Sequence, residues 1–346
     1  MPGYAEMKSA RKILFITDTK DLTDKLLLEV VRKQVKGFIR LGCDTQVFSF
    51  NHAVDKASPF KRKEIVRFFK SRADELLLEQ IKNYVPDIVI VSFAKYLDAE
   101  TINRAREAAG RVPFIGVDVD LWPQLHKGRI EAASKLDLVL TTYGENGQQF
   151  LKEAKVKCIF MPNACDPDIE YRYDVPDKWK SDIIFTGKDQ HIHYPTEKVR
   201  TQIINELTSM SGCAVYGCLG RPQIFGMDYY YAISGAKTGL SINAVNDIQL
   251  YHSDRLTHYL SCGTFVLAKN VPDSDLLFKD RIHLRYFETA EEFFELADWY
   301  LKHDDERTKI ANAGMEYVHR EFNCQKIAGY ILDCIDKGFY RAPWMP

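Results

Sequence analysis

The sequence predicts an α/β protein with two domains, each built round a parallel sheet that helices cover on both faces. Short apolar runs alternate with amphipathic stretches along most of the 346 residues. Strands that are apolar along their whole length, separated by helices, are typical of such sheets. One interval, CDPDIEYRYDVPDKWKS (165–181), breaks the rhythm because it is rich in Pro, Asp and aromatic residues and has no periodicity. We therefore expect the domain boundary there.

Six apolar runs predict the strands of the first domain. They are residues 12–17, 45–50, 87–93, 113–120, 136–142 and 157–164. Apolar residues at helical spacing predict the helices between them. These helices are 21–43, 71–84, 98–109, 126–135 and 144–154.

The alternation resumes after the boundary and predicts a second domain. Its strands are residues 182–187, 213–217, 238–243, 263–269 and 283–287. Its helices are 197–210, 229–236, one that begins near Arg255, 289–303, 304–322 and 324–339. We expect domains at 1–165 and 175–325, and a helical tail at 326–346 that packs back toward the first domain.

Composition narrows the class of protein. Hydrophobic residues make up 46% and charged residues 27%, which indicates a soluble globular chain. The net charge of -1 gives no support for binding duplex nucleic acid. Eight cysteines without a CxxC pair, and polar first residues unlike a signal peptide, predict reduced thiols in a cytoplasmic protein. No apolar run approaches the roughly 20 residues that span a bilayer.

Several common nucleotide and hydrolase motifs are absent. No GxGxxG follows the first strand, and the chain has neither GxxxxGK[ST] nor GxSxG. These absences argue against ordinary dinucleotide binding, a P-loop NTPase and the usual hydrolase elbow. Open parallel sheets bind ligands beyond the carboxyl ends of their strands, so residues that directly follow each strand become candidates.

Two such segments suit an anion. Ser253 opens a helix beside Arg255, and a helix start with a guanidinium favours a diphosphate. Gly187 allows close backbone approach after a strand, and Lys188 can meet a phosphate. The alternatives remain that Ser253 only caps the helix, that Arg255 is a surface charge, and that Lys188 is a solvated turn residue.

Several segments of the sequence resemble the motifs of a known family. DIIFTGKDQH, EKVRTQIINEL, GLSINAV, SDRLTHYLSCGTFVLA and HDDERTKIANAGMEYV resemble the donor-binding domain of GT-B glycosyltransferases. The nearest branch is the one related to spore-maturation glycosyltransferases, with a "glycosyl transferases group 1" C-terminal domain. MPNACDPDI resembles the hinge before that domain, and FIGVDVDLWP with LDLVLTTYGENGQQFLKE fits the acceptor-side domain. The similarity covers most of residues 12 to 330.

The resemblance implies two Rossmann-like domains facing across a cleft. It also implies transfer of a sugar from a nucleotide-diphosphate donor to an acceptor hydroxyl on a carbohydrate or other molecule. It implies neither a metal nor a cofactor besides that co-substrate. Arg255, Lys188 and the backbone after Ser253 would stabilise the leaving group.

The remaining donor-site residues follow from the same resemblance. Asn243 and His258 would contact the sugar or ribose. Gly263 and Thr264 would lie near the diphosphate or support the turn. His258 stands where many relatives carry Glu, which puts the identity of the donor in question.

An inverting reaction needs a base on the acceptor side. Asp120 is the first candidate and Asp118 the second, because both end a strand at the predicted sheet edge. Either could instead cap the next segment or bind a backbone amide. His126 is a further candidate. The two histidines of HIH (191–193) make a poor metal site, so no metal is predicted.

Two rival functions remain open. A glycosyltransferase that modifies hydroxymethylated bases in DNA would need a basic groove, for which KASPFKRKEIVRFFKSR (56–72) is the candidate, although this run also fits a solvated helix face. A non-catalytic nucleotide-sugar-binding relative is the other, and His258 is its best argument.

Overall fold

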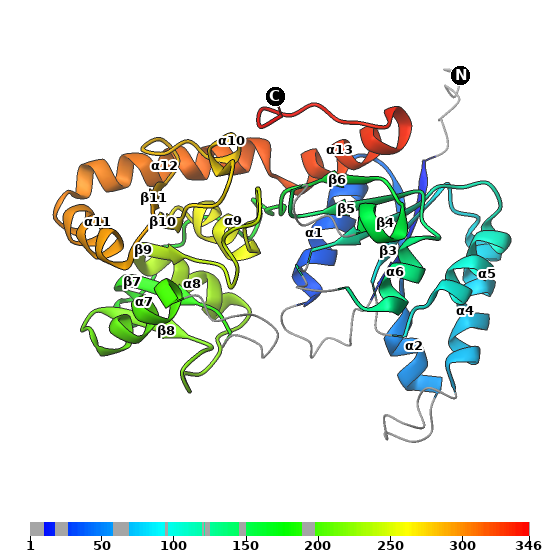
Figure 1. Ribbon diagram of the computed structural model, residues 1–346, viewed down its shortest axis with the longest axis horizontal. Coiled ribbons are helices and arrows are strands. Elements are labelled where there is room, and N and C mark those ends of the chain that lie inside the picture. The colour runs from blue at the N-terminus through cyan, green and yellow to red at the C-terminus, as the bar shows by residue number, and fades with distance from the viewer. Residues whose placement is uncertain are drawn as a thin grey trace, which may run out of the picture.

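The chain folds into two lobes, each containing one parallel sheet (Figure 1). The computed structural model describes residues 10–17, 27–57, 69–93, 96–119, 121, 125–144, 150–188 and 198–345, without the side chains of residues 27–29 and 151. Two parallel sheets with covering helices confirm the predicted fold class.

The sheet of the first lobe has the strand order β2-β1-β3-β4-β5-β6, and all its pairs are parallel. Its strands are β1 (Lys12–Thr17), β2 (Asp44–Ser49), β3 (Ile88–Ser92), β4 (Phe114–Asp118), β5 (Leu138–Thr141) and β6 (Cys158–Phe160). Its helices are α1 (Leu27–Arg40), α2 (Phe50–Ala57), α4 (Lys70–Tyr84), α5 (Ala99–Ala109) and α6 (Lys127–Ala133), and a π-helix, η3, spans Phe150–Ala154.

Both faces of this sheet are buried, which explains the apolar strands. Ile13 and Phe15 of β1 belong to the core that Phe38 of α1 shares. Leu14 and Ile16 point to the opposite core, which α4 and α5 complete. A strand whose side chains alternate between two cores cannot carry a polar face.

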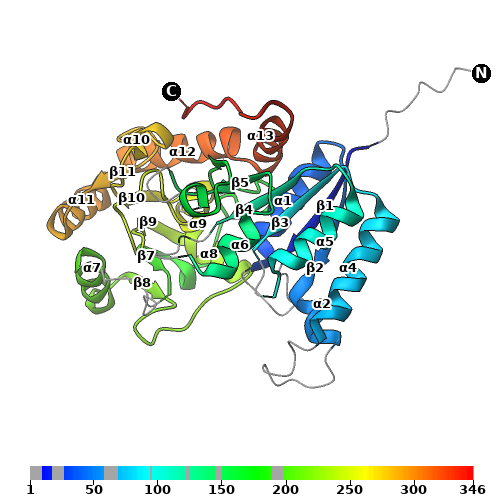
Figure 2. The same cartoon turned by 45° about the vertical axis from the view of Figure 1, so that its right-hand side comes forward.

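The sheet of the second lobe has the order β11-β10-β9-β7-β8 and is also parallel. Its strands are β7 (Ser181–Thr186), β8 (Cys213–Tyr216), β9 (Ala236–Ser241), β10 (Phe265–Lys269) and β11 (Arg285–Phe287). Its helices are α7 (Lys198–Ser209), α8 (Met227–Gly235), α9 (Asp254–Ser261), α10 (Ser274–Leu277), α11 (Ala290–Lys302) and α12 (Asp304–Glu321), and a short 3-10 helix, η4, spans Asp177–Trp179. The helices α7 and α11 cover one face, whereas α8 and α9 pack on the other (Figure 2).

The last helix, α13 (Cys324–Lys337), returns to the first lobe and packs on α1. Gly37 of α1 permits this approach, because a Cβ there would lie 2.1 Å from the carbonyl oxygen of Cys324. Arg11 forms an ion pair of 2.7 Å with Asp336, and the Tyr340 hydroxyl donates to the Phe160 carbonyl. One apolar core consequently runs through both lobes.

The predicted elements and the observed ones differ in a few places. Each predicted strand has a counterpart within a few residues of its expected ends. The helices α2 and α10 were not predicted, and of the predicted helix 144–154 the structure describes only η3 and the residue before the gap. No helix among the described residues is long and apolar enough to cross a membrane.

Candidate functional site

A pocket of about 270 Å³ opens at the carboxyl ends of β7 and β8, against the start of α9. We call it the second-lobe pocket. Its walls come from the ends of β7 and β8, the loop before α8, and the first turns of α8 and α9. It is lined by Thr186, Gly187, Lys188, Tyr216, Gly217, Gln223, Ile224, Phe225, Tyr229, Ser253, Asp254, Arg255 and His258.

Two glycines let the backbone approach closely on one side of this pocket. Gly217 has φ +82, and a Cβ there would lie 2.5 Å from the Gly187 carbonyl oxygen. A Cβ on Gly187 would lie 2.7 Å from the ring of Phe185 and 3.1 Å from the Arg255 guanidinium. Larger side chains at either position would therefore displace this wall or the arginine behind it.

Arg255 ties the carboxyl ends of two strands together beside the pocket. Its guanidinium donates to the carbonyl oxygens of Thr186 and Ile242 and lies over the ring of Phe185, with 4.9 Å to the ring centroid. Arg200 approaches the same ring at 5.1 Å and donates to the same Ile242 carbonyl at 2.7 Å. Among the described residues, the Nε of Arg255 has no hydrogen-bond partner. The predicted anion-binding arginine thus lines the pocket with its planar group held in place.

The start of α9 is shaped by Asn243. The Asn243 side-chain oxygen accepts from the backbone N–H of Ser253 at 3.0 Å, and its amide donates to the Tyr251 carbonyl at 3.0 Å. Ser253 occupies the N-cap position, yet its side chain makes no capping bond, and within the described chain its hydroxyl has no partner. Asn243 is buried, and its side chain holds the backbone of the loop before α9, whereas Ser253 and the first turn of α9 face the pocket.

His258 belongs to a buried network of charges that joins the two lobes. Lys33, on α1 of the first lobe, places its ammonium 3.1 Å from Glu170 and 3.5 Å from Asp254. The Nε2 of His258 lies 3.1 Å from Asp254 and 3.1 Å from Lys33, and its Nδ1 lies 3.1 Å from the Tyr229 hydroxyl. Both ring nitrogens of His258 are therefore engaged by protein groups.

The protonation states in this network depend on one another. Burial by itself lowers the pKa of His258, but Asp254 and Glu170 outweigh burial and Lys33, so the pKa is raised. Burial likewise opposes the charge on Lys33, and the two carboxylates raise its pKa overall. With two carboxylates and one ammonium, the network is neutral when His258 carries a proton. The two carboxylates thus favour the protonated form of His258, the residue that was expected to contact the sugar or ribose.

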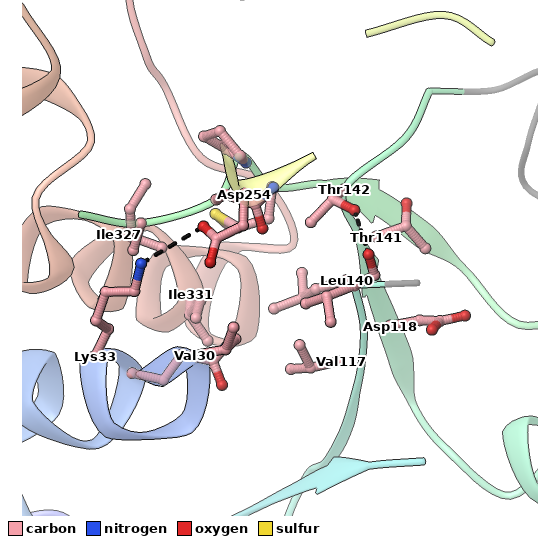
Figure 3. A pocket seen from close by; sticks show the side chains of 16 residues that line it. Val30, Lys33, Val117, Asp118, Leu140, Thr141, Thr142, Asp254, Ile327 and Ile331 are labelled. Carbon is pink, nitrogen blue, oxygen red and sulfur yellow. Dashed lines mark hydrogen bonds and ion pairs between the residues drawn. The ribbon is translucent and has the colours of Figure 1, made fainter. Parts of the chain in front are cut away.

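A second, much smaller cavity, of about 30 Å³, lies between the lobes, and we call it the interlobe cavity. Its walls come from α1, the carboxyl ends of β4 and β5, the segment 161–164 and α13. Figure 3 shows Lys33 reaching from α1 toward Asp254 across this cavity. Asp254 lines both the interlobe cavity and the second-lobe pocket, so it marks their junction.

The structure gives Asp118 partners of its own. Its carboxylate forms an ion pair with Arg129 and accepts a hydrogen bond of 3.1 Å from the Tyr143 hydroxyl. Burial and the adjacent carboxylate raise the pKa of the Tyr143 phenol. Asp118 lines the interlobe cavity, yet its carboxylate points away from Asp254 in Figure 3. Asp120, the first candidate for the base, lies outside the described residues.

Several other predicted residues lie away from the second-lobe pocket. Gly263 and Thr264 follow the far end of α9, where Arg172 donates to the Gly263 carbonyl and the Thr264 hydroxyl donates to the Ile233 carbonyl. Gly263 has φ +69, so these residues support the turn, which was one of the two expectations for them. His126 is exposed just before α6.

Two predicted segments lie wholly or mostly outside the described residues. They are HIH (191–193) and the basic run 56–72, of which 58–68 are not described. Within the described parts of the chain, no group of three or more His, Cys, Asp or Glu side chains could hold a metal ion.

Sequence reasoning missed Lys33, Glu170, Asp254 and Arg200. Lys33 lies in a helix in which Arg32, Lys36 and Arg40 are at least partly exposed, and Glu170 lies in the irregular interval. Neither position carries a local signal, because burial of both arises only when the lobes come together. The predicted helix start did point to Ser253 and Arg255, and Asp254 lies between them, where it was expected at most to cap the helix.

Comparisons with known proteins bear on the fold and on the family of the second lobe. Residues 200–333 match the family described as glycosyl transferase-like. A glycosyltransferase from Rickettsia africae has a TM-score of 0.62 at 14% identity, with 95% of this chain and 99% of that one covered. HepE (Alr3699) from Anabaena, solved with UDP and glucose, has a TM-score of 0.61 at 11% identity, with 94% and 100% covered.

A third structure is similar over the same extent. Sucrose-phosphate synthase from Thermosynechococcus elongatus has a TM-score of 0.62 at 12% identity, with 95% of this chain and 99% of that one covered. No curated protein matches the chain. These comparisons confirm the predicted GT-B fold, and residues 200–333 match the glycosyl transferase-like family.

Proposed function

We propose that the protein transfers a sugar from a nucleoside-diphosphate sugar, bound in the second-lobe pocket, to an acceptor hydroxyl that enters from the interlobe side. The observation that carries this proposal is the composition of the pocket. A close backbone approach at Gly187 and Gly217, the fixed guanidinium of Arg255 and the start of α9 meet at the carboxyl ends of β7 and β8. Such a place suits a pyrophosphate in an open parallel sheet.

The same groups suggest how the leaving group is stabilised. When the bond from the sugar to the pyrophosphate breaks, negative charge accumulates on the nucleoside diphosphate. Lys188 and Arg255 line the pocket, and the N–H groups of the first turn of α9 supply further positive potential. We propose that these groups act without a bound metal, so that EDTA leaves the transfer rate unchanged.

The acceptor is a hydroxyl of a carbohydrate or another small molecule in this proposal. Asp120 remains the proposed base for an inverting reaction, since Asp118 is engaged by Arg129 and Tyr143. The motifs quoted from the second lobe support a place near the spore-maturation branch. The relatives solved with UDP and UDP-glucose support a uridine donor as the first to test.

A binding screen followed by an assay of turnover tests the proposal. UDP, GDP, ADP and TDP sugars and CMP sugars are screened for a rise in melting temperature, with Arg255→Ala as the matched variant. We expect at least one donor to stabilise the wild type and not the variant, and the same donor to be hydrolysed slowly or transferred. Failure of every donor to bind the wild type contradicts the proposal. Binding without hydrolysis or transfer over a broad acceptor panel favours a non-catalytic relative.

A further inference from the structure

We propose that Asp254 is the residue that binds the hydroxyl groups of the donor sugar, and that Lys33 and His258 position its carboxylate. This inference rests on the proposed function and deepens it. Asp254 lines both the second-lobe pocket and the interlobe cavity. The transferred sugar has to occupy that junction, because its donor lies on one side and its acceptor arrives from the other.

The carboxylate of Asp254 differs from its buried partner Glu170 in access. The Asp254 side chain is 26% exposed, whereas that of Glu170 is fully buried. Glu170 also accepts a hydrogen bond of 2.8 Å from the Asp166 backbone N–H, so its second oxygen is engaged. Asp254 is therefore the carboxylate of this network that a ligand in either cavity can reach.

Two contacts fix where the Asp254 carboxylate points. The Lys33 ammonium meets one of its oxygens and the His258 ring meets the other, at 3.5 Å and 3.1 Å. His258 lies one helical turn after Asp254 on α9 and is itself held by Tyr229. Each carboxylate oxygen has further lone pairs, so an oxygen with one protein donor can still accept from a sugar hydroxyl.

His258 is poorly suited to bind the sugar itself. It is 6% exposed, and its two nitrogens already meet Tyr229, Asp254 and Lys33. Whichever ring nitrogen carries a proton, both nitrogens are directed at protein groups here. The hydroxyl-binding role thus falls to the carboxylate one turn earlier, with His258 as its support.

Lys33 makes this arrangement depend on the first lobe. It is the part of the network that α1 contributes, and its ammonium pairs with the buried Glu170 and with Asp254, which lines the pocket. Without it, the negative charge beside the site proposed for a pyrophosphate would be less fully compensated. The sugar end of the site is therefore complete only when the lobes are together.

Paired titrations with and without the sugar test the inference. UDP and UDP-glucose, with GDP and GDP-mannose in parallel, are titrated calorimetrically into the full-length wild type and Asp254→Asn. Hydrogen bonds to a charged group predict that the ratio of the Kd for UDP-glucose to the Kd for UDP rises about 10- to 100-fold in the variant. The Kd of the variant for UDP stays within about threefold of the wild-type value, because loss of a negative charge near the pyrophosphate cannot weaken nucleotide binding electrostatically.

The controls separate this effect from general damage. Asp228→Asn makes the same change of charge at an exposed position on α8 and leaves the ratio unchanged. Lys33→Met raises the ratio and Lys36→Met, on the same helix, does not. If Asp254→Asn fails to fold, Asp254→Glu replaces it as the test, because it keeps the charge and moves the carboxylate outward by one methylene. For Asp254→Glu we expect a raised ratio of the two Kd values and an unchanged Kd for UDP.

The outcomes distinguish the two proposals. If the wild type binds none of the donors in the wider screen of UDP, GDP, ADP, TDP and CMP sugars, the proposed function fails and the inference with it. If it binds UDP, but Asp254→Asn weakens UDP and UDP-glucose equally or changes neither, the inference alone is overturned.

Discussion

Replacement of Lys33 by methionine removes one charge from the buried network and keeps a side chain of similar length. Its ammonium lies 3.1 Å from Glu170, 3.5 Å from Asp254 and 3.1 Å from the Nε2 of His258. With an effective dielectric constant of about 20, each of these charge pairs interacts by about 5 kcal/mol, attractive for the two carboxylates and repulsive for an imidazolium. Removal of one partner from a buried ion pair destabilises proteins by about 3–5 kcal/mol. We expect Lys33→Met to lower the free energy of unfolding by that amount.

Equilibrium unfolding in urea measures the loss, with Lys36→Met as the matched control. Lys36 lies on the same helix, its side chain is 26% exposed, and Arg32 still pairs with Asp166 when it is removed. We expect the control to lose about 1 kcal/mol or less. The double variant Lys33→Met with Glu170→Gln removes one charge of each sign and should recover much of the stability. A Lys33→Met protein no less stable than Lys36→Met, or a double variant no better than the single one, would refute the reasoning.

Three further predictions concern the glycines and the pH dependence. Gly217→Ala should lower both the free energy of unfolding and the affinity for nucleotide. Its control is Gly220→Ala, because Gly220 also has a positive φ of +72 but has open space around it. The control should lose only about 1–2 kcal/mol for the strained backbone and keep its nucleotide affinity in calorimetric titrations. Gly37→Ala should destabilise the chain because its Cβ meets the Cys324 carbonyl, whereas Gly329→Ala, in open space on α13, should stabilise it by about 0.5–1 kcal/mol in urea. The raised pKa of His258 means that its contribution to stability is fully present below pH of about 6.5 and is lost as the pH rises through the folded-state pKa. Urea midpoints at several pH values should therefore fall more steeply with rising pH in the wild type than in His258→Gln, and equal slopes would contradict this.

The predicted sheets agree with the structure because their signal is local. The strands β1, β3 and β7 are buried on both faces, so each has to be apolar along nearly its whole length. The pattern also located the end of β7 and the start of α9, which together form the second-lobe pocket. Helix α2 escaped prediction because it follows β2 directly, with Phe50 as its first residue, and no turn residue separates the two.

The site could be predicted only in part. Arg255 and Gly187 line the pocket, as the order of strands and helices suggested. The Asn243 side chain instead forms hydrogen bonds with the backbone of the loop before α9. His258 lines the pocket, and its ring nitrogens are engaged by groups from α1, α8 and the interval 165–181. A histidine at one position in a sequence carries no sign of which distant carboxylates will surround it.

The sequence by itself determined the two-sheet architecture, the glycosyl transferase-like second lobe and the strand ends where a ligand can bind, because periodicity and motif spacing are properties of neighbouring residues. The tertiary structure alone decided that Lys33, Glu170, Asp254 and His258 form one network between the lobes. These residues lie on three segments far apart in the chain, and each is of a type that usually remains in water. Their burial becomes favourable only when opposite charges from both lobes meet at hydrogen-bonding distance.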